Sequence, residues 1–350
     1  MSNPPVGASP RTRPGPSIGD VARLAGLSQQ TVSRVANGAD NVRPATRDRV
    51  LEAMDQLGYS PNHAARALRS GSFQTIGVIA HRLSRTGEAR TVEAVVEAAR
   101  TEGYTVSLID VESPSTSDMT AAATRLSHQA IDGLIIIRAE DATPSTLALP
   151  PRMPVVVSDS RFVGHLPAIG ADQAAGTALA VQHLLDLGHR SVHHVRGPAD
   201  SGPANMRAEA WAARLRTAGR PVPEALYGDW TAASGYLAGQ KLAQDPEVTA
   251  VLCANDEMAA GVMLALHEAG RRIPEDISII GFDDLPLGAY MWPPLTSVNL
   301  DFSTIGKELV AALLTQLRDG VGLSGHHVLV PTHLVVRSST APPPSSSAIA

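Results

Sequence analysis

The chain has 350 residues, of which 43% are hydrophobic, and its mean hydropathy is -0.01, so it is long enough for two or three domains with sizeable cores. It has no apolar run long enough to cross a bilayer, and residues 1–16 are rich in Pro, Ser and Arg without the apolar segment of a secretory signal. The one cysteine, Cys253, excludes an intramolecular disulfide and fits a reducing compartment. These features predict a globular cytoplasmic protein with no membrane partner and a disordered tail at residues 1–16.

The net charge of -5 is unevenly distributed along the chain. Residues 1–75 carry nine arginines against five acidic residues, whereas the remainder carries 20 basic and 29 acidic residues. Because DNA phosphates are bound mainly by Lys and Arg, this distribution predicts a basic N-terminal part that can bind nucleic acid and an acidic body that does not.

The first structured stretch has the pattern of two helices joined by a turn that contains glycine. Ser17 can cap a first helix, with the carboxylate of Asp20 three positions later, and Gly26 ends that helix. Ser28 can cap a second helix, which runs to Asn37. The DNA-binding helix-turn-helix has this arrangement, although an ordinary helical hairpin with a polar surface has the same pattern.

The second helix has one apolar side and one polar side. Val32 and Val35 lie three positions apart and can face a core. Gln and Arg side chains form paired hydrogen bonds with adenine and guanine edges in the major groove, so the polar side suits base recognition. That polar side carries Gln29, Gln30, Ser33, Arg34 and Asn37.

A third helix and a short helical segment follow. Pro44 suits the first turn of the third helix, and Gly58 suits its end. Residues 61–71 form a segment too short to stay helical in water without packing. This segment is either a linker between domains or a hinge that becomes helical on DNA and inserts Leu68 between base steps of the minor groove.

From Ser72 the pattern changes to alternating apolar strands and amphipathic helices. In a first half we predict strands at 76–80, 104–109, 133–137 and 155–157 and helices at 91–102 and 121–130. In a second half we predict helices at 174–187, 203–218, 232–243 and 256–269 and strands at 191–195, 249–253 and 277–281, then a segment at 295–298, a helix near 303–318 and strands near 327–336. This alternation predicts two α/β halves with doubly wound parallel sheets and a ligand cleft between them.

Several motifs of the N-terminal part resemble those of the lactose/galactose repressor family of transcriptional regulators, and the resemblance continues to about residue 337. The motifs are Asp20-Val21-Ala22, Ala25-Gly26-Leu27-Ser28, Thr31-Val32-Ser33-Arg34-Val35, Asn37-Gly38 and Leu57-Gly58-Tyr59-Ser60-Pro61-Asn62. The resemblance implies an all-α helix-turn-helix headpiece with a hinge helix, and an α/β body with the architecture of a periplasmic sugar-binding protein. The domains we predict are a headpiece at 17–60, a hinge at 61–71, a body at 72–340 and a disordered tail at 341–350, with an N-subdomain of about 72–170 plus 299–337 and a C-subdomain of about 171–298.

The resemblance also assigns DNA contacts. Side chains of the second helix would read major-groove bases, four polar residues would contact the backbone, and three hinge residues would enter the minor groove. Arg43 departs from the small hydroxyl or acidic residue that is common before the third helix. The predicted DNA-binding residues are Ser28, Gln29, Gln30, Thr31, Ser33, Arg34, Asn37, Thr46, Asn62, His63, Ala65, Arg66 and Leu68.

The resemblance places an effector site at the strand ends. A sugar needs carboxylates and amides that accept from its hydroxyls, an Arg that donates, and an aromatic ring against its apolar face. Each residue that the resemblance assigns to this site could, on its own, also have an ordinary structural role, in a helix cap, a turn or the core. Residues 81–87 depart from the apolar segment usual in the family, which leaves the effector's identity open. The predicted effector-binding residues are Asp159, Arg207, Trp230, Asn255, Asp283 and Phe302.

Other chemistry has little support in the sequence. The pairs His193-His194 and His326-His327 lie in strands, where alternation directs adjacent side chains to opposite faces, so they make poor metal ligands. There is no Walker loop, dinucleotide-binding glycine motif or nucleophile elbow. We therefore predict no enzyme activity, no catalytic residue, no metal and no cofactor.

The function that these features predict is a homodimeric repressor of sugar-utilisation genes, which binds a pseudo-palindromic operator on double-stranded DNA and responds to a small carbohydrate-like effector. A regulator with the same fold and a non-sugar effector or a protein co-regulator is the alternative. A transport-type sugar-binding protein would share the body but lack the headpiece, and an enzyme on this fold would need catalytic groups at the cleft.

Overall fold

The computed structural model describes residues 16–36, 39, 41–59, 71–112, 115–137, 149, 153–158, 166–320 and 325–344. Seven of the predicted binding residues therefore lie outside the described residues, as do most of the two predicted tails. The chain divides into two compact units, Met1–Phe73 and Gln74–Ala350. The binding residues outside the described part are Asn37, Asn62, His63, Ala65, Arg66, Leu68 and Asp159.

The first unit contains three helices: α1 (Ile18–Ala25), α2 (Gln29–Ala36) and α3 (Pro44–Leu57). Ser17 and Asp20 form the reciprocal capping box of α1, and Gly26 ends that helix at a φ of 63°. Val21, Val32 and Val50, one from each helix, are fully buried and form the centre of the small core. The local signals in the sequence thus agree with the structure of this unit.

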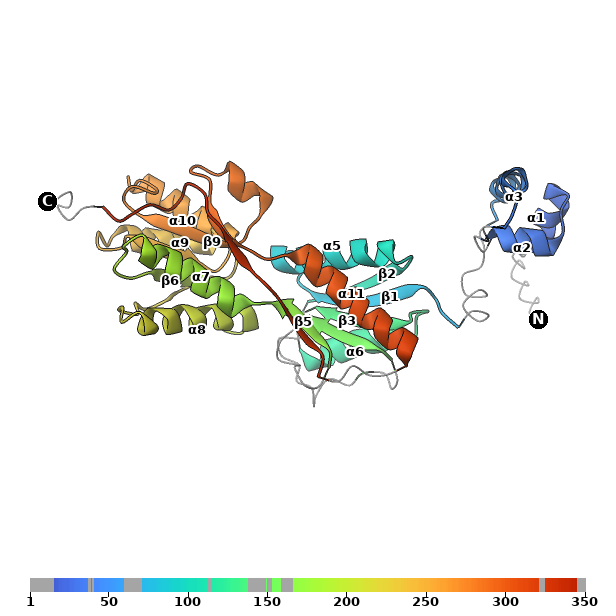
Figure 1. Ribbon diagram of the computed structural model, residues 1–350, viewed down its shortest axis with the longest axis horizontal. Coiled ribbons are helices and arrows are strands. Elements are labelled where there is room, and N and C mark those ends of the chain that lie inside the picture. The colour runs from blue at the N-terminus through green and yellow to red at the C-terminus, as the bar shows by residue number, and fades with distance from the viewer. Residues whose placement is uncertain are drawn as a thin grey trace, which may run out of the picture. The chain divides into compact units, whose positions relative to one another are not determined.

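The second unit consists of two lobes, each built on a six-stranded sheet (Figure 1). The N-lobe sheet has the order β11-β5-β4-β3-β1-β2, and the C-lobe sheet has the order β12-β10-β9-β8-β6-β7. All described strand pairs are parallel except β10 with β12. This agrees with the predicted pair of doubly wound α/β halves.

The elements of the N-lobe are β1 (Thr75–His81), α5 (Thr86–Thr101), β2 (Thr105–Val111), α6 (Thr116–Ser127), β3 (Gly133–Ile137), β4 (Val155–Ser158), β5 (Ala168–Ala171), α11 (Phe302–Asp319) and β11 (His327–Val330). Those of the C-lobe are α7 (Gln173–Asp186), β6 (His193–Arg196), α8 (Gly202–Thr217), β7 (Leu226–Tyr227), α9 (Ala232–Ala243), β8 (Ala250–Cys253), α10 (Asp256–Glu268), β9 (Ser278–Asp283), the 3-10 helix η2 (Pro286–Tyr290), β10 (Thr296–Asn299) and β12 (His333–Val335). Helix α5 begins five residues before the predicted start at 91, because its first turn has no apolar periodicity to mark it.

The chain crosses between the lobes three times, after β5, after β10 and between β11 and β12 (Figure 1). The last crossing corrects the predicted boundary, which gave all of residues 299–337 to the N-subdomain. β12 pairs with β10, so the chain returns to the C-lobe before it ends. Ala341, predicted to begin a disordered tail, also packs on the C-lobe, where its backbone N–H donates to Ser278 Oγ at 3.0 Å.

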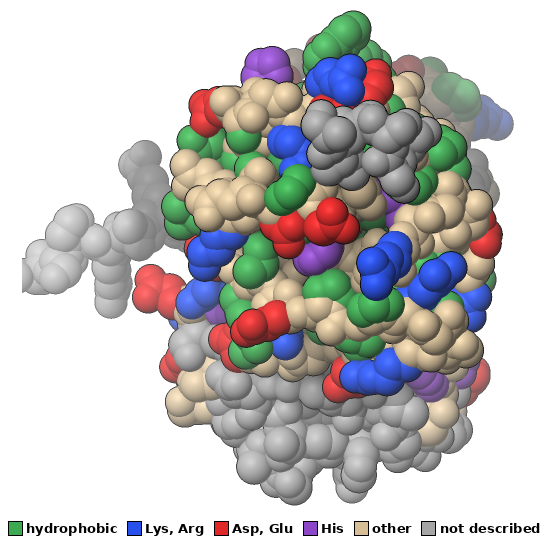
Figure 2. All heavy atoms as spheres, turned by 90° about the vertical axis from the view of Figure 1, so that its left-hand side faces the viewer, with side chains coloured by type: hydrophobic (Ala, Val, Ile, Leu, Met, Phe, Trp, Pro, Cys, Tyr) green, Lys and Arg blue, Asp and Glu red, His purple; other side chains and the backbone are tan. Residues whose placement is uncertain are grey.

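The surface at the far end of the C-lobe mixes side chains of all kinds. Figure 2 shows Lys and Arg interspersed with Asp and Glu on this face, without a continuous basic patch among the residues it colours. None of the helices in the described part of the chain is both long and apolar enough to span a membrane.

Helices α9 and α10 pack so closely that position 261 of α10 requires glycine. A methyl group on Gly261 would overlap the backbone oxygen of Ala232 and the backbone nitrogen of Tyr236, and backbone atoms cannot move aside as a flexible side chain can. We expect Gly261→Ala to lower the free energy of unfolding by about 1–3 kcal/mol, because overpacking outweighs the gain of up to about 1 kcal/mol in helix propensity.

Urea unfolding followed by circular dichroism measures this change. Gly170→Ala is the matched control, since no atom outside its own chain neighbours lies within 4 Å of the added methyl group. Equal stability of the two variants would contradict the packing argument.

Candidate functional site

Helix α2 is folded so that its polar side remains accessible. Ser28 caps it, because its Oγ accepts from the backbone N–H of Thr31 at 3.1 Å. Val32 and Val35 are buried in the core of the first unit. Of the predicted base-reading side chains, Ser33 is half-buried, and those exposed are Gln29, Gln30 and Arg34.

Contacts from α3 fix the turn that leads into α2. Arg49 Nη2 donates to the carbonyl oxygen of Ala25 at 2.6 Å, directly before the left-handed Gly26. A cation at the C-terminal end of α1 also interacts favourably with the helix dipole. Arg43, which departs from the family pattern, precedes α3 without a capping hydrogen bond from its side chain. Thr46, a predicted backbone contact, is half-buried in the first turn of that helix.

Four of the predicted effector-binding residues line one cavity between the two lobes: Arg207, Trp230, Asn255 and Asp283. Arg207 comes from α8, Trp230 precedes α9, Asn255 caps α10 and Asp283 ends β9. The N-lobe contributes the start of α5 to the opposite wall. The cavity volume is about 20 Å³, and Thr86 and Glu257 on its two walls are in direct contact, so the lobes are closed against each other at this point.

The guanidinium of Arg207 is almost fully buried, with 2% of its surface exposed. Its Nε donates to Gln173 Oε1 at 2.8 Å, Nη1 donates to the backbone oxygen of Ala254, and Nη2 lies 3.4 Å from Asp283 Oδ1. The ring of Phe282 lies 3.8 Å from the guanidinium carbon. The charge is therefore held rigidly, next to the cavity.

A hydrogen bond joins the lobes across the cavity. Thr86 Oγ1 at the start of α5 donates to Glu257 Oε1 in the first turn of α10 at 2.5 Å. The side chain of Asn255 forms its hydrogen bonds within the C-lobe. Its Oδ1 accepts from the backbone N–H of Met258 at 2.9 Å, and its Nδ2 donates to the backbone oxygen of Trp230 at 2.9 Å. Asn255 therefore orients Trp230 and caps α10 in this closed form.

Strained backbone and a buried polar atom also lie at the cavity. Trp230 has a φ of 76° and Asp283 a φ of 99°, a region in which residues other than glycine are rare and strained. In the described part of the chain, the buried Trp230 Nε1 has no hydrogen-bond partner. Buried polar groups without partners are unusual in folded proteins, and this one is a hydrogen-bond donor in a residue that lines the cavity.

Two charged residues of the N-lobe wall, Arg85 and Glu88, were not among the predicted site residues. They line the cavity, 3.7 Å apart, with 11% and 1% of their side chains exposed. The sequence feature that could have indicated these two residues is the polar segment at residues 81–87, which departs from the family pattern and contains Arg85. Which of its side chains face the C-lobe depends on how α5 is oriented, and the sequence does not contain that orientation.

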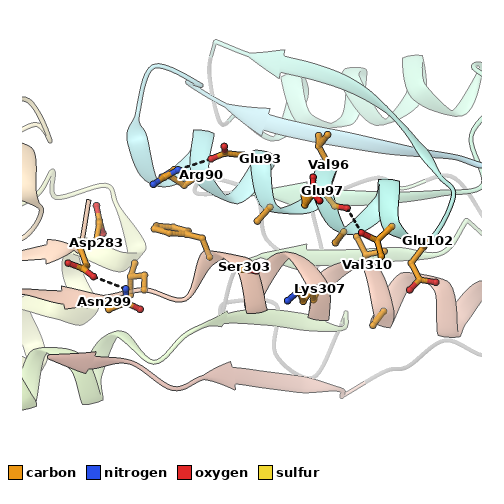
Figure 3. Close-up of a pocket in the computed structure, with 17 residues that line it drawn as sticks. Arg90, Glu93, Val96, Glu97, Glu102, Asp283, Asn299, Ser303, Lys307 and Val310 are labelled. Atoms are coloured by element: carbon orange, nitrogen blue, oxygen red, sulfur yellow. Dashed lines mark hydrogen bonds and ion pairs between the residues drawn. The ribbon is translucent and has the colours of Figure 1, made fainter. Parts of the chain in front are cut away.

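Phe302 lies away from the closed cavity. It lines a groove of about 1090 Å³ between α5 and α11, which Asp283 also borders. Figure 3 shows Arg90, Glu93 and Glu97 along one side of this groove and Lys307 along the other, with Asp283 at one end. Asp283 thus lies at both sites, whereas Phe302 lines only the groove.

A second buried carboxyl group, that of Asp256, forms hydrogen bonds that join α10 to the segments around β9 and β10 of the C-lobe. Asp256 Oδ1 accepts from Ser297 Oγ at 2.6 Å, and Oδ2 accepts from Leu285 N at 2.7 Å. Burial raises the pKa of Asp256 to about 7, since removal from water disfavours the charged form. No group of His, Cys, Asp and Glu suited to a metal ion occurs among the described residues.

Two family models match the chain. Residues 17–62 match the bacterial regulatory proteins of the lacI family, and residues 181–340 match the periplasmic binding protein-like domain. The lactose operon repressor of Escherichia coli (strain K12) is 36% identical over 334 residues, covering 94% of this chain and 92% of the repressor. The regulator CelR of Thermobifida fusca is 32% identical over 336 residues, covering 93% of this chain and 98% of CelR.

Solved structures agree with these matches. The structure of the lac repressor dimer bound to operator and the anti-inducer ONPF has a TM-score of 0.80 and 33% identity, and the match covers 94% of this chain and 100% of that chain. The chain belongs to the lacI family of bacterial regulatory proteins. The relatives are transcriptional regulators and not enzymes, which confirms the predicted family, fold class and absence of enzyme activity.

The raised pKa of Asp256 predicts a pH dependence of stability. Its pKa rises from 3.8 to about 7 on folding, so the stabilisation from the protonated carboxyl is complete below the unfolded value and is lost as the pH rises through 7. We expect Asp256→Asn to remove a fall of about 2–4 kcal/mol in the free energy of unfolding between pH 4 and pH 7.

Chemical denaturation at several pH values measures this fall. Asp276 is the control, because hydrogen bonds from Arg272 lower its pKa and give the opposite sign. An Asp256→Asn variant with the full pH dependence of the unchanged protein would rule out Asp256 as its source.

Proposed function

We propose that the protein is a sequence-specific DNA-binding repressor whose operator affinity changes when a small carbohydrate-like effector binds between the N-lobe and the C-lobe. The observation that carries this proposal is the convergence of Arg207, Trp230 and Asp283 on one inter-lobe cavity of a chain that also carries a helix-turn-helix. A DNA-binding role also implies a cytoplasmic location, as the sequence predicts.

The DNA-binding part of the proposal rests on α2. Its exposed Gln29, Gln30 and Arg34 have the amide and guanidinium groups that pair with base edges. An apolar back against the core holds these groups on a rigid helix, which favours specific recognition over non-specific phosphate binding. The predicted contacts at Asn37 and in the hinge remain predictions, since these residues lie outside the described part.

The effector-binding part rests on the chemistry of the cavity. Asp283 and Glu257 can accept hydrogen bonds from hydroxyls, Arg207 can donate, and Trp230 offers an aromatic ring with its N–H. These groups suit a neutral molecule with several hydroxyls. A solved complex of the transcriptional regulator CelR with cellobiose, 29% identical to this chain with a TM-score of 0.67, supports a sugar as the first candidate.

Binding of a sugar requires the lobes to separate. A ligand pocket usually needs at least about 300 Å³, which far exceeds the present cavity. The contact between Thr86 and Glu257 must then break or rearrange, so effector binding and lobe closure are coupled. This coupling fits an effector that lowers operator affinity, an inducer, and equally one that raises it, a corepressor.

We also propose that the active form is a homodimer. η2 and the residue pair after it expose large apolar side chains, with Leu287 69%, Tyr290 85% and Trp292 95% exposed. A surface of this kind is usually covered by a partner. The matching lac repressor structure is that of a dimer on its operator, and a twofold protein suits a palindromic operator.

A non-sugar effector is the second candidate. The buried pair of Arg85 and Glu88 in the cavity wall gives the site a charged surface. A charged ligand that is not a sugar could bind through this pair, so the candidate effectors include charged non-sugar molecules as well as sugars.

We expect Arg34→Ala to weaken binding to a selected palindromic duplex by about tenfold or more, a cost of about 1–3 kcal/mol for one lost base contact. The duplex is selected from a random library with the purified protein, and fluorescence anisotropy measures the affinity at fixed salt. Arg23→Ala is matched in charge; its side chain is exposed on α1 and pairs with Asp20. An equal loss in both variants would mean that Arg34 acts only through its charge.

We expect Arg207→Lys to weaken the response to sugar at least about tenfold, because Lys keeps the charge but cannot make the forked contacts of the guanidinium. The change in affinity for the selected duplex, in either direction, is titrated with lactose, D-ribose, cellobiose and glucose 6-phosphate. Arg214→Lys, on the same helix, is the control. A response that is unchanged in Arg207→Lys would remove Arg207 from the effector site, and a response to none of the four would count against a sugar effector.

A further inference from the structure

Strand β9 ends at Asp283, and Asp283 and the next residue, Asp284, both have a backbone conformation that favours glycine. Asp283 has a φ of 99° and Asp284 a φ of 52°, both in the left-handed region. Residues other than glycine are strained there and persist only where their surroundings fix them. Interactions beyond the local backbone must therefore hold this Asp283–Asp284 turn, and with it the carboxylate that borders the cavity.

Both carboxylate oxygens of Asp284 are engaged. Arg337 Nη2 donates to Oδ1 at 2.6 Å, and Asn299 Nδ2 donates to Oδ2 at 2.9 Å. The backbone N–H of Asp284 donates to Ser297 Oγ at 3.1 Å. Only 20% of the Arg337 side chain and 13% of the Asp284 side chain are exposed, so solvent screens this ion pair much less than a surface pair.

Arg337 is in turn fixed to the next strand. Its Nη1 donates to the carbonyl oxygen of Leu295 at 2.7 Å, and its backbone N–H donates to Thr296 Oγ1 at 2.9 Å. β10 continues into α11 of the N-lobe, and β12, which precedes Arg337, follows β11 of the N-lobe. Arg337 therefore connects the Asp283–Asp284 turn with two of the segments that cross between the lobes.

We propose that Arg337 is a positioning residue for the effector site. It does not belong to the cavity lining given above, but through Asp284 it sets the carboxylate of Asp283 and links that carboxylate to the crossing segments. A change at Asp283 on ligand binding would then reach the connection between the lobes. The link to an effector rests on the proposed function, whereas the positioning of the turn does not.

Hydrogen exchange without any ligand tests the positioning. In Arg337→Gln, the backbone amides of Asp284 and Leu285, which donate to Ser297 Oγ and Asp256 Oδ2, should exchange at least about tenfold faster, while those of β9 before the turn stay protected. Arg272→Gln removes a comparable but exposed pair with Asp276 in the same lobe and should change neither group. Equal acceleration throughout β9 and the turn would mean that Arg337 only stabilises the lobe, and would overturn the proposal.

A second substitution tests whether Arg337 acts through the backbone of Asp284. Glycine adopts a positive φ without strain, so Asp284→Gly in the Arg337→Gln background should keep the turn left-handed. Crystal structures of both variants should show the turn changed in Arg337→Gln and restored in the double variant. A turn that keeps its φ values in Arg337→Gln alone would show that Arg337 does not hold it.

Calorimetric titration adds the functional readout. With whichever of lactose, D-ribose or cellobiose binds the unchanged protein, the dissociation constant should rise about tenfold in Arg337→Gln and recover in the double variant. An unchanged constant would remove the effector link. If the unchanged protein binds none of the three sugars, the proposed sugar effector fails, while hydrogen exchange still decides the role of Arg337.

Discussion

The buried guanidinium of Arg207 is the interaction on which the arrangement of the cleft depends. A charge removed from water costs several kcal/mol unless it is paired and hydrogen-bonded. Gln173, the Ala254 carbonyl and Asp283 supply that pairing, and Phe282 packs on the guanidinium. Because these partners come from α7, β9 and the end of β8, one side chain fixes where several elements of the C-lobe meet.

The cleft combines strain with rigid support. Trp230 and Asp283 have left-handed backbones, and each is held by hydrogen bonds from neighbouring elements. The first turns of α5 and α10 face each other across the cleft, where Thr86 and Glu257 meet. Backbone strain is retained where the surrounding structure fixes it, and such sites are often functional. The closed cleft is thus built from groups that a ligand can engage only if the lobes move.

The two units separate two kinds of recognition. The headpiece is basic and presents α2 from a small core, with the turn before α2 fixed by Arg49. The body is acidic and surrounds a cavity lined with charged and aromatic groups. In the proposed function, phosphate attraction and base contacts belong to the first unit, and hydrogen bonding to a small molecule belongs to the second. Membership of the lacI family agrees with this division.

The sequence by itself determined the element types, the capping of α1 and α2 and the two α/β halves, because periodicity and capping depend on residues close together in the chain. The family resemblance also pointed to Arg207 in a helix and to Asp283 at a strand end as effector-site residues. Only the tertiary structure decided that Thr86 meets Glu257, 171 positions away, and that Phe302 lines the groove and not the closed cavity. Those contacts depend on how the two lobes close, and packing between distant elements sets that closure.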